Sequence, residues 1–352
     1  MHNPVIRSIA AGVRGQCYRQ DEIFQILRPY FNQNPRAEVI FQNAGVGSRY
    51  LAVAGEYYQE ERSTQARNER YMEEAMLIGE QVIAEGLRKA GAGLEDVGDL
   101  IIVSCTGIDT PGLDLRLAGK MGLPPDLRRA CLLGMGCYGA FPGLLRGSEA
   151  VLARPDRLAV VLCVEICSLH FQPGDQSIEN VVSSALFADG AAAAVIGMMP
   201  GSRPAPRLID SATYCDYQTF DHMAFHLTDH GFRMSLSAYV PRLLAAQIEE
   251  FVDHLLARNH LSRDQIRHWG VHPGSAKILD FVQERLGLAD DDLAASRKVL
   301  YEYGNMSSAT ILFVLDEIIR TRQPAPDEYG VIMSFGPGLT MEAALIQWGA
   351  GS

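Results

Sequence analysis

The sequence lacks the long apolar runs of a membrane protein. Its richest run, residues 191–199, has only nine residues and follows Asp189 and Gly190, whereas a membrane-spanning helix needs about 20. The segment from Met1 to Arg7 contains no basic region followed by an apolar stretch, so we predict no secretory signal. We therefore expect a cytoplasmic protein with no membrane span.

Cysteine and positive charge are also scarce. The seven cysteines are an odd number without paired short spacings, which favours reduced thiols over a disulfide network. Neither CxxC nor HExxH occurs, so we predict no metal site. The 31 Lys and Arg residues are outnumbered by 42 Asp and Glu residues, giving a formal charge of −11. This balance argues against a nucleic-acid partner.

What is present fits a globular protein with a large core, because 47% of the 352 residues are hydrophobic. A helical spacing over residues 75–90 is followed by an apolar strand at 100–103, and a second over 240–256 is followed by a strand near 269–271. The breaker-rich segment 200–206 lies between the two. We predict two similar halves, an N-terminal one over residues 1–200 and a C-terminal one over residues 201–352.

Further apolar runs of strand length predict the class of fold. Two occur in each half, at residues 158–164, 191–196, 330–334 and 343–346. Continuous apolar strands that alternate with helices indicate an α/β protein, with helices on both faces of mixed sheets.

A glycine-rich segment, residues 134–140, places Cys137 directly before a helix-like stretch over 141–153. Glycines on both sides let the backbone turn sharply, and the positive end of a helix favours a thiolate. Both features suit a nucleophilic cysteine. The alternative is a small core residue whose neighbouring glycines permit close packing.

His272 follows the strand near 269–271 and precedes Pro273 and Gly274, where the chain breaks. A histidine at a strand end can reach a neighbouring site while the strand fixes its ring, as the partner of a thiolate or a donor to an oxyanion requires. The chain has nine histidines, and most histidines lie on the surface or are satisfied in the core. The position alone does not identify a site.

Asn305 precedes the helical pattern of residues 311–319. An asparagine there caps the helix, and its amide can also be directed at a carbonyl oxygen. Residues 334–340 form a tight turn between two apolar strands and need no functional explanation. The sequence contains neither the GxxxxGK[ST] loop of nucleotide-binding proteins nor the GxSxG elbow of serine hydrolases.

Taken together, four motifs resemble those of the type III polyketide synthases, the chalcone and stilbene synthase family, in order and spacing. They are residues 136–137, 272–274, 304–309 and 335–340, and the resemblance extends from about residue 43 to residue 345. It implies the duplicated thiolase-like fold with five layers, αβαβα, which agrees with the two similar halves. It also implies a homodimer that binds no cofactor and uses acyl-coenzyme A and malonyl-coenzyme A as substrates.

The family's catalytic Cys, His and Asn correspond to Cys137, His272 and Asn305. The resemblance implies that His272 keeps the Cys137 thiol ionised, so that the thiolate takes an acyl group from a coenzyme A thioester. His272 and Asn305 would then donate hydrogen bonds to the malonyl thioester oxygen and stabilise the enolate formed on loss of carbon dioxide. Repeated two-carbon extension and cyclisation would give an alkylpyrone, an alkylresorcinol or a polyhydroxy-aromatic product.

The resemblance also implies roles at the entrance to the cavity. The segment 186–190 matches the family's Leu-Phe-Gly-Asp-Gly motif, so Phe187 corresponds to the phenylalanine that gates the junction between the coenzyme A tunnel and the cavity. Met234 replaces a second gating phenylalanine of the plant enzymes. Basic residues at the mouth of the tunnel are matched by Arg49 and Lys277.

Several positions depart from the plant enzymes. Cys105 and Cys167 replace threonines of the cavity wall, as in some bacterial members, and Thr110 replaces a methionine lent to the partner subunit's cavity. Ser275 and Ser334 stand where the family has glycine. These changes argue against chalcone formation and favour a cavity for an aliphatic or malonyl starter.

Two other functions remain open at this point. A β-ketoacyl-[acyl-carrier-protein] synthase of the third type has the same fold and triad, but it typically shows Gly-Asn-Thr-Ser where residues 304–307 read Gly-Asn-Met-Ser. A non-catalytic scaffold with the thiolase fold would be expected to have lost the reactive residues, and all three are present.

Overall fold

A central sheet of nine strands runs through the protein. The structure is a computed structural model and describes all residues except 1–3, 32–33, 199–203, 237–239 and 350–352. The strand order is β11-β12-β13-β8-β1-β7-β6-β4-β5. The first half of the chain supplies β1 (Val5–Gly12), β4 (Val97–Ser104), β5 (Arg128–Leu133), β6 (Leu158–Ile166) and β7 (Asp189–Gly197). The second half supplies β8 (Ala205–Cys215), β11 (Ile266–Val271), β12 (Tyr329–Gly336) and β13 (Thr340–Gly349).

The two halves of the sheet repeat one arrangement. In the first, β4 and β6 are parallel, and β6–β7 and β7–β1 are antiparallel. In the second, β11 and β12 are parallel, and β12–β13 and β13–β8 are antiparallel. The half-sheets meet where β1 pairs with β8 at a single position, Val5 with Arg207. The predicted boundary at residue 200 falls in the segment 199–203, which lies outside the described residues.

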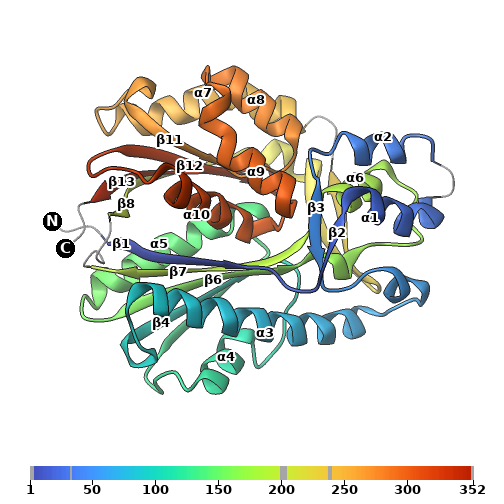
Figure 1. The fold of residues 1–352 in the computed structure, drawn as a ribbon, viewed down its shortest axis with the longest axis horizontal. Coiled ribbons are helices and arrows are strands. Elements are labelled where there is room, and N and C mark those ends of the chain that lie inside the picture. Colours follow the sequence, from blue (N-terminus) through green and yellow to red (C-terminus); the bar gives the residue numbers. More distant parts are fainter. Residues whose placement is uncertain (1–3, 32–33, 199–203, 237–239, 350–352) are drawn as a thin grey trace.

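Helices cover both faces of each half-sheet, so that helices and half-sheets together form five layers (Figure 1). Helices α3 (Thr64–Ala90) and α4 (Leu113–Met121) cover the outer face of the first half, and α7 (Val240–Ala257) covers that of the second, with α8 (Ala276–Leu286) against it. Helices α5 (Ala140–Ala153) and α10 (Thr310–Arg322) lie between the half-sheets. Their apolar side chains, among them Phe141, Leu144, Ile311 and Val314, form a central core. The predicted α/β class is confirmed.

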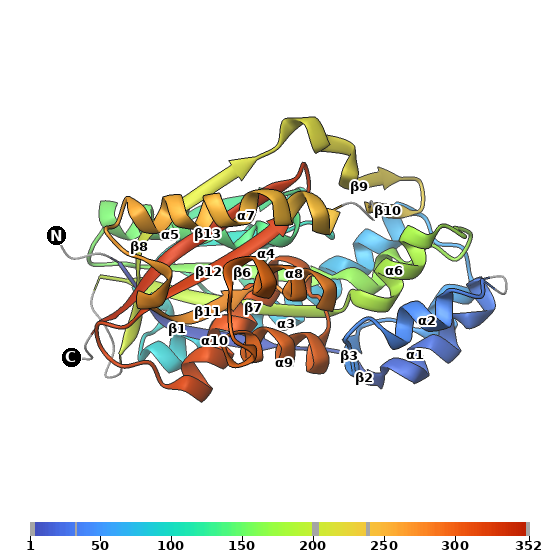
Figure 2. The same cartoon turned by 90° about the horizontal axis from the view of Figure 1, so that it is seen from above.

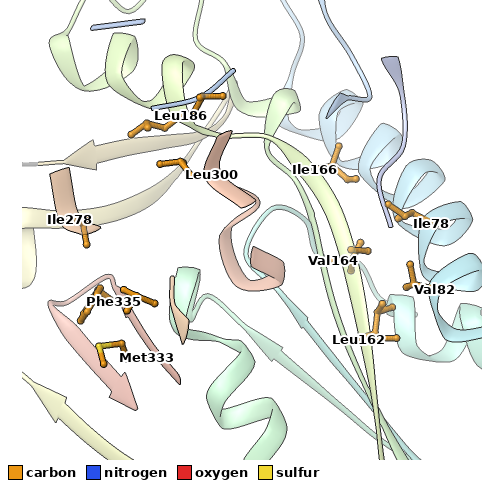
Figure 3. Close-up of a cluster of buried hydrophobic side chains, with 14 of the residues drawn as sticks. Ile78, Val82, Leu162, Val164, Ile166, Leu186, Ile278, Leu300, Met333 and Phe335 are labelled. Carbon is orange, nitrogen blue, oxygen red and sulfur yellow. The ribbon is translucent and has the colours of Figure 1, made fainter. Parts of the chain in front are cut away.

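Helix α3 illustrates how the sequence determines these layers. The hydroxyl of Ser63 accepts a hydrogen bond from the amide of Ala66 at the N-terminus, and Gly91 ends the helix in the left-handed conformation with φ 65°. Ile78 and Val82 on its buried face lie opposite apolar side chains of β6 (Figure 3). The helix predicted over residues 75–90 is confirmed.

The predicted apolar strands are confirmed as parts of β4, β6, β7, β11, β12 and β13. Every residue of β6 and β7 is buried, because helices cover both faces of these strands. Strand β5 differs, because it forms the edge of the sheet and five of its six residues are exposed.

The remaining elements gather at one end of the sheets (Figure 2). They include two small antiparallel pairs, β2 (Gln16–Arg19) with β3 (Ser48–Leu51) and β9 (Met223–Thr228) with β10 (Gly231–Leu236). The helices of this region are α1 (Gln20–Leu27), α2 (Ala37–Gln42) and α6 (Ile178–Leu186). Helix α9 (Ala294–Tyr303) lies against α10 and contacts β3. Within the described ranges, no helix combines the length and the hydropathy needed to cross a membrane.

Candidate active site

A cavity of about 320 Å³ lies where these elements meet the ends of the central strands. Its wall contains Cys137 from the first half of the chain and His272 with Asn305 from the second. The volume is within the usual range for a small-molecule site. Three residues that are more than 30 positions apart in the sequence therefore face one cavity.

Cys137 lies in a one-turn 3₁₀ helix, Gly136–Tyr138, directly before α5. Gly136 has φ 68°, and a Cβ atom there would lie 2.6 Å from Cδ of Pro337. Both conditions require glycine at this position. The glycines predicted to let the chain turn at Cys137 thus also let the turn of residues 336–338 approach it.

The surroundings of Cys137 act on its pKa in opposite directions. Burial raises the pKa of the thiol to about 12, although hydrogen bonds from Ser307 and Asn305 favour the thiolate. The nearby carboxylate of Glu165 also raises the pKa. A thiolate at Cys137 therefore needs a compensating positive charge.

His272 directly follows β11, as predicted. Its amide donates to the carbonyl of Met333 on β12 (2.8 Å), which fixes the main chain, and its side chain is buried. Neither ring nitrogen has a hydrogen-bond partner among the described residues. Burial lowers the pKa of the imidazole to about 3, so the isolated ring is neutral and both nitrogens are available to the cavity.

Asn305 is fixed by its main chain and by its side chain. Its amide donates to Leu186 (2.8 Å), and its carbonyl accepts from Ala188 (2.9 Å). The side-chain oxygen accepts from the amide of Ser307 (2.8 Å), as in a helix cap. The side-chain nitrogen makes a long contact of 3.4 Å with the carbonyl of Gly274 and also donates toward the sulfur of Cys137. Asn305 thus caps the 3₁₀ turn Ser307–Ala309 before α10 and retains donor capacity at the cavity.

Phe187 and Met234 also line the cavity. Phe187 ends α6 and is joined to Asn305 by an isolated bridge of β type. Met234 lies on β10, opposite Phe225 of β9. Both residues therefore face the same cavity as Cys137, from separate elements.

The two predicted basic residues lie in different environments. Lys277, the second residue of α8, is exposed and lines the cavity, so its position agrees with a tunnel mouth. Arg49 on β3 also lines the cavity, but it is only 1% exposed. Its guanidinium donates to the carbonyl of Phe187 (2.6 Å) instead of facing solvent.

Cys105 and Cys167 line the cavity, as expected. Glu165, two residues before Cys167, is a fully buried carboxylate in the otherwise apolar end of β6. It accepts hydrogen bonds from Thr106 (2.7 Å) and Ser308 (2.6 Å). Burial raises the pKa of this carboxyl group. The sequence signal for it was a single acidic residue inside an apolar strand, which the sequence analysis did not use.

The cavity also contains His170, another residue that sequence analysis missed. Its Nε2 lies 2.7 Å from the carbonyl of Thr106, and its Nδ1 accepts from the amide of Phe232 (3.2 Å). These contacts define a neutral ring with the proton on Nε2. Burial lowers the pKa of His170 to about 4. The residue holds β10 to the wall of the cavity.

The two serines at glycine positions have definite contacts. The hydroxyl of Ser275 caps α8 by accepting from the amide of Ile278 (3.3 Å), and Ser334 donates to the carbonyl of Cys137 (2.9 Å). Neither replacement removes a group from the cavity. Thr110, by contrast, is exposed in the loop between β4 and α4, so its role in a partner's cavity stays a prediction.

The matches to family models cover most of the chain. Residues 47–200 match the N-terminal domain of chalcone and stilbene synthases, and residues 212–348 match their C-terminal domain.

Two bacterial proteins illustrate the similarity in sequence. The chain is 32% identical over 345 residues to the 3,5-dihydroxyphenylacetyl-CoA synthase of Amycolatopsis balhimycina, covering 97% of this chain and 92% of the relative. It is 35% identical over 309 residues to the 1,3,6,8-tetrahydroxynaphthalene synthase of Streptomyces peucetius, covering 87% and 82%.

The fold is similar to that of a solved structure over its full length. The crystal structure of 1,3,6,8-tetrahydroxynaphthalene synthase from Streptomyces coelicolor A3(2) superimposes with a TM-score of 0.93 at 26% identity. The superposition covers 99% of this chain and all of the other.

Proposed function

Because the chain belongs to the chalcone and stilbene synthase family of type III polyketide synthases, we propose that Cys137, His272 and Asn305 are its catalytic residues. The family condenses acyl groups from coenzyme A thioesters. The observation that carries the assignment is the meeting of these three side chains at one cavity.

The loading step needs a thiolate at a buried position. Burial disfavours a lone thiolate at Cys137 and a lone imidazolium at His272. Transfer of the thiol proton to the ring creates two opposite charges that stabilise each other. The sulfur then attacks the acyl-coenzyme A carbonyl, and the coenzyme A thiolate leaves as the new thioester bond forms.

The extension step needs donors for a developing oxyanion. Nε2–H of His272 and the side-chain NH₂ of Asn305 would donate to the thioester oxygen of malonyl-coenzyme A. Loss of carbon dioxide leaves an electron pair that the resulting enolate holds on this oxygen. The enolate carbon attacks the acyl-Cys137 carbonyl, which releases the cysteine sulfur and lengthens the chain by two carbons.

The substrates and products are assigned only by chemical class. A cavity wall that includes Ile23, Leu27 and Val182 suits an aliphatic acyl starter or one built from malonyl units. Repeated extension followed by cyclisation would yield an alkylpyrone, an alkylresorcinol or a polyhydroxy-aromatic compound. Phe187 and Met234 would gate the entrance, and Lys277 would attract the phosphates of coenzyme A.

A homodimer is the proposed assembly. Strand β5 presents an unpaired, exposed edge, and Leu133 on it is 39% exposed. Ile108, near Thr110, is 55% exposed. A second copy of the chain that pairs with this edge would cover both apolar side chains. Thr110 could then reach the partner's cavity.

The test is incubation of the protein with acyl-coenzyme A and malonyl-coenzyme A, without any carrier protein. We expect pyrones, resorcinols or polyhydroxy-aromatic compounds by mass spectrometry. Formation of product only when malonyl-[acyl-carrier-protein] replaces malonyl-coenzyme A would contradict the assignment and indicate the carrier-protein-dependent condensing enzyme.

A further inference from the structure

Arg49 is a buried cation with few direct partners. Its side chain is 1% exposed, and Nε and Nη2 have neither solvent contact nor a hydrogen-bond partner among the described residues. Burial lowers the pKa of the guanidinium to about 10. Because burying a charge is costly, the contacts that Arg49 does make indicate why it is there.

The polar contact of Arg49 is with the proposed gate. Nη1 donates to the main-chain carbonyl of Phe187 (2.6 Å), 138 positions along the chain. A hydrogen bond from a charged donor to a buried carbonyl is stronger than a neutral one. Arg49 therefore fixes the main chain at the residue whose ring lines the cavity.

The methylene groups of Arg49 contact a second functional segment. A Cβ atom on Gly304 would lie 2.8 Å from both Cγ and Cδ of Arg49, so the arginine stem packs directly against this glycine. Gly304 precedes Asn305, the proposed oxyanion donor. One side chain thus supports the gate and the catalytic amide together.

Asp189, two residues after Phe187, is a second buried charged group in this region. Its carboxylate accepts from the amides of Ala52 (2.6 Å) and Ser168 (2.7 Å), which connects the end of β3 to the turn that bears Cys167. The charges of Arg49 and Asp189 attract each other. Both ends of the short segment 187–189 are therefore fixed by buried charged groups.

We propose that Arg49 is a positioning residue that acts through the carbonyl of Phe187 and the packing of Gly304, and that it is not a ligand of coenzyme A. It holds the Phe187 ring at the cavity entrance and Asn305 at the cavity wall. The inference rests on the proposed function, because it assumes that Phe187 gates the entrance.

The first experiment is a double-mutant cycle with Arg49→Met and Phe187→Ala, and with Arg88→Met on the exposed face of α3 as the matched control. Loss of a hydrogen bond from a charged donor should raise the KM for the acyl-coenzyme A starter about tenfold in Arg49→Met. If Arg49 acts through Phe187, the same substitution should change KM less than about twofold in the Phe187→Ala background. If the two substitutions change KM independently, so that their factors multiply in the double variant, the proposal is overturned.

The second experiment separates positioning from coenzyme A binding. The starter is supplied as its coenzyme A thioester and as its pantetheine thioester, which lacks the nucleotide and its phosphates. We expect Arg49→Met to raise the KM for both thioesters by the same factor. A selective loss for the coenzyme A thioester would show direct contact with the phosphates and contradict the inference.

One further variant and one further measurement guard against a folding defect. Arg49→Lys retains a charged donor, so its KM for the starter should lie closer to that of the unaltered protein than the KM of Arg49→Met does. The rate of Cys137 alkylation by a bulky maleimide, followed by mass spectrometry, reports gate opening without turnover and should rise in Arg49→Met. If Phe187→Ala changes neither the KM nor the alkylation rate, the proposal that Phe187 is a gate is contradicted. If Phe187→Ala changes both quantities while Arg49→Met changes neither, only the proposed positioning role of Arg49 is contradicted.

Discussion

The hydroxyl of Ser334 donates a hydrogen bond of 2.9 Å to the main-chain carbonyl of Cys137, across 197 positions of the sequence. The bond connects β12 of the second half to the cysteine turn of the first. Gly136 and Pro337 are in contact beside it. The position of Cys137 therefore depends on both halves of the chain.

Ser334→Gly tests how much this bond contributes. The variant loses one buried hydrogen bond and gains backbone freedom, so we expect the free energy of unfolding to fall by about 1–2 kcal/mol. Ser275→Gly is the matched control, because a cap replaced by glycine costs only a few tenths of a kcal/mol. If urea unfolding shows that the free energy of unfolding falls equally in the two variants, the Ser334 bond adds no more stability than an ordinary helix cap.

Asn305→Ala should separate the two chemical steps. Removal of one oxyanion donor is expected to slow malonyl-coenzyme A decarboxylation about 10²–10³-fold. Starter loading should remain measurable, because it depends on Cys137 and His272. Decarboxylation can be followed as carbon dioxide release and loading as the mass of the intact protein. Loss of loading with decarboxylation intact would reverse the assigned roles.

The pH dependence of Cys137 alkylation tests the proposed proton transfer. Burial raises the thiol pKa to about 12 when no imidazolium compensates it. In His272→Ala, the alkylation rate with iodoacetamide should therefore rise about tenfold per pH unit between pH 6 and 9. The unaltered protein should react at least about tenfold faster at pH 7 and depend less on pH. Identical profiles would mean that His272 does not ionise Cys137.

His170 should make the fold sensitive to acid. Its pKa is lowered to about 4 by burial, below the value of about 6.5 in an unfolded chain. The neutral ring therefore stabilises the fold fully above pH 6.5, and this contribution is lost as the pH falls toward 4. Between pH 7 and pH 4.5, the stability advantage over His170→Gln should shrink by about 2–3 kcal/mol. A constant difference would contradict a buried, neutral His170.

Local sequence patterns predicted the elements whose two faces are both covered. Residues 158–164 and 191–196 are continuous apolar runs, and they form the buried strands β6 and β7. Strand β5 was not predicted, although residues 130–133 form a short apolar run after two arginines. The pair β9–β10 was also not predicted, since it is held partly by distant residues such as His170.

Cavity residues that lie within sequence motifs were predicted, whereas residues that hold the cavity wall from distant parts of the chain were not. Cys137, His272 and Asn305 lie within motifs, whereas Glu165 and Arg49 are explained by partners far away in the sequence. The bonds from Ser308 to Glu165 and from Arg49 to Phe187 span 143 and 138 positions. No local pattern encodes such contacts, and the family resemblance gave Arg49 a place at the tunnel mouth without showing its bond to Phe187.

The central claim is that Cys137 carries the growing chain, and the mass of the protein after brief incubation with acyl-coenzyme A tests it most directly. We predict an added acyl mass on the peptide that contains Cys137. Cys137→Ala should show neither this mass nor any chain extension, while Cys131→Ala, at an exposed cysteine on β5, should retain both. An acyl group on another residue, or unchanged turnover in Cys137→Ala, would contradict the account.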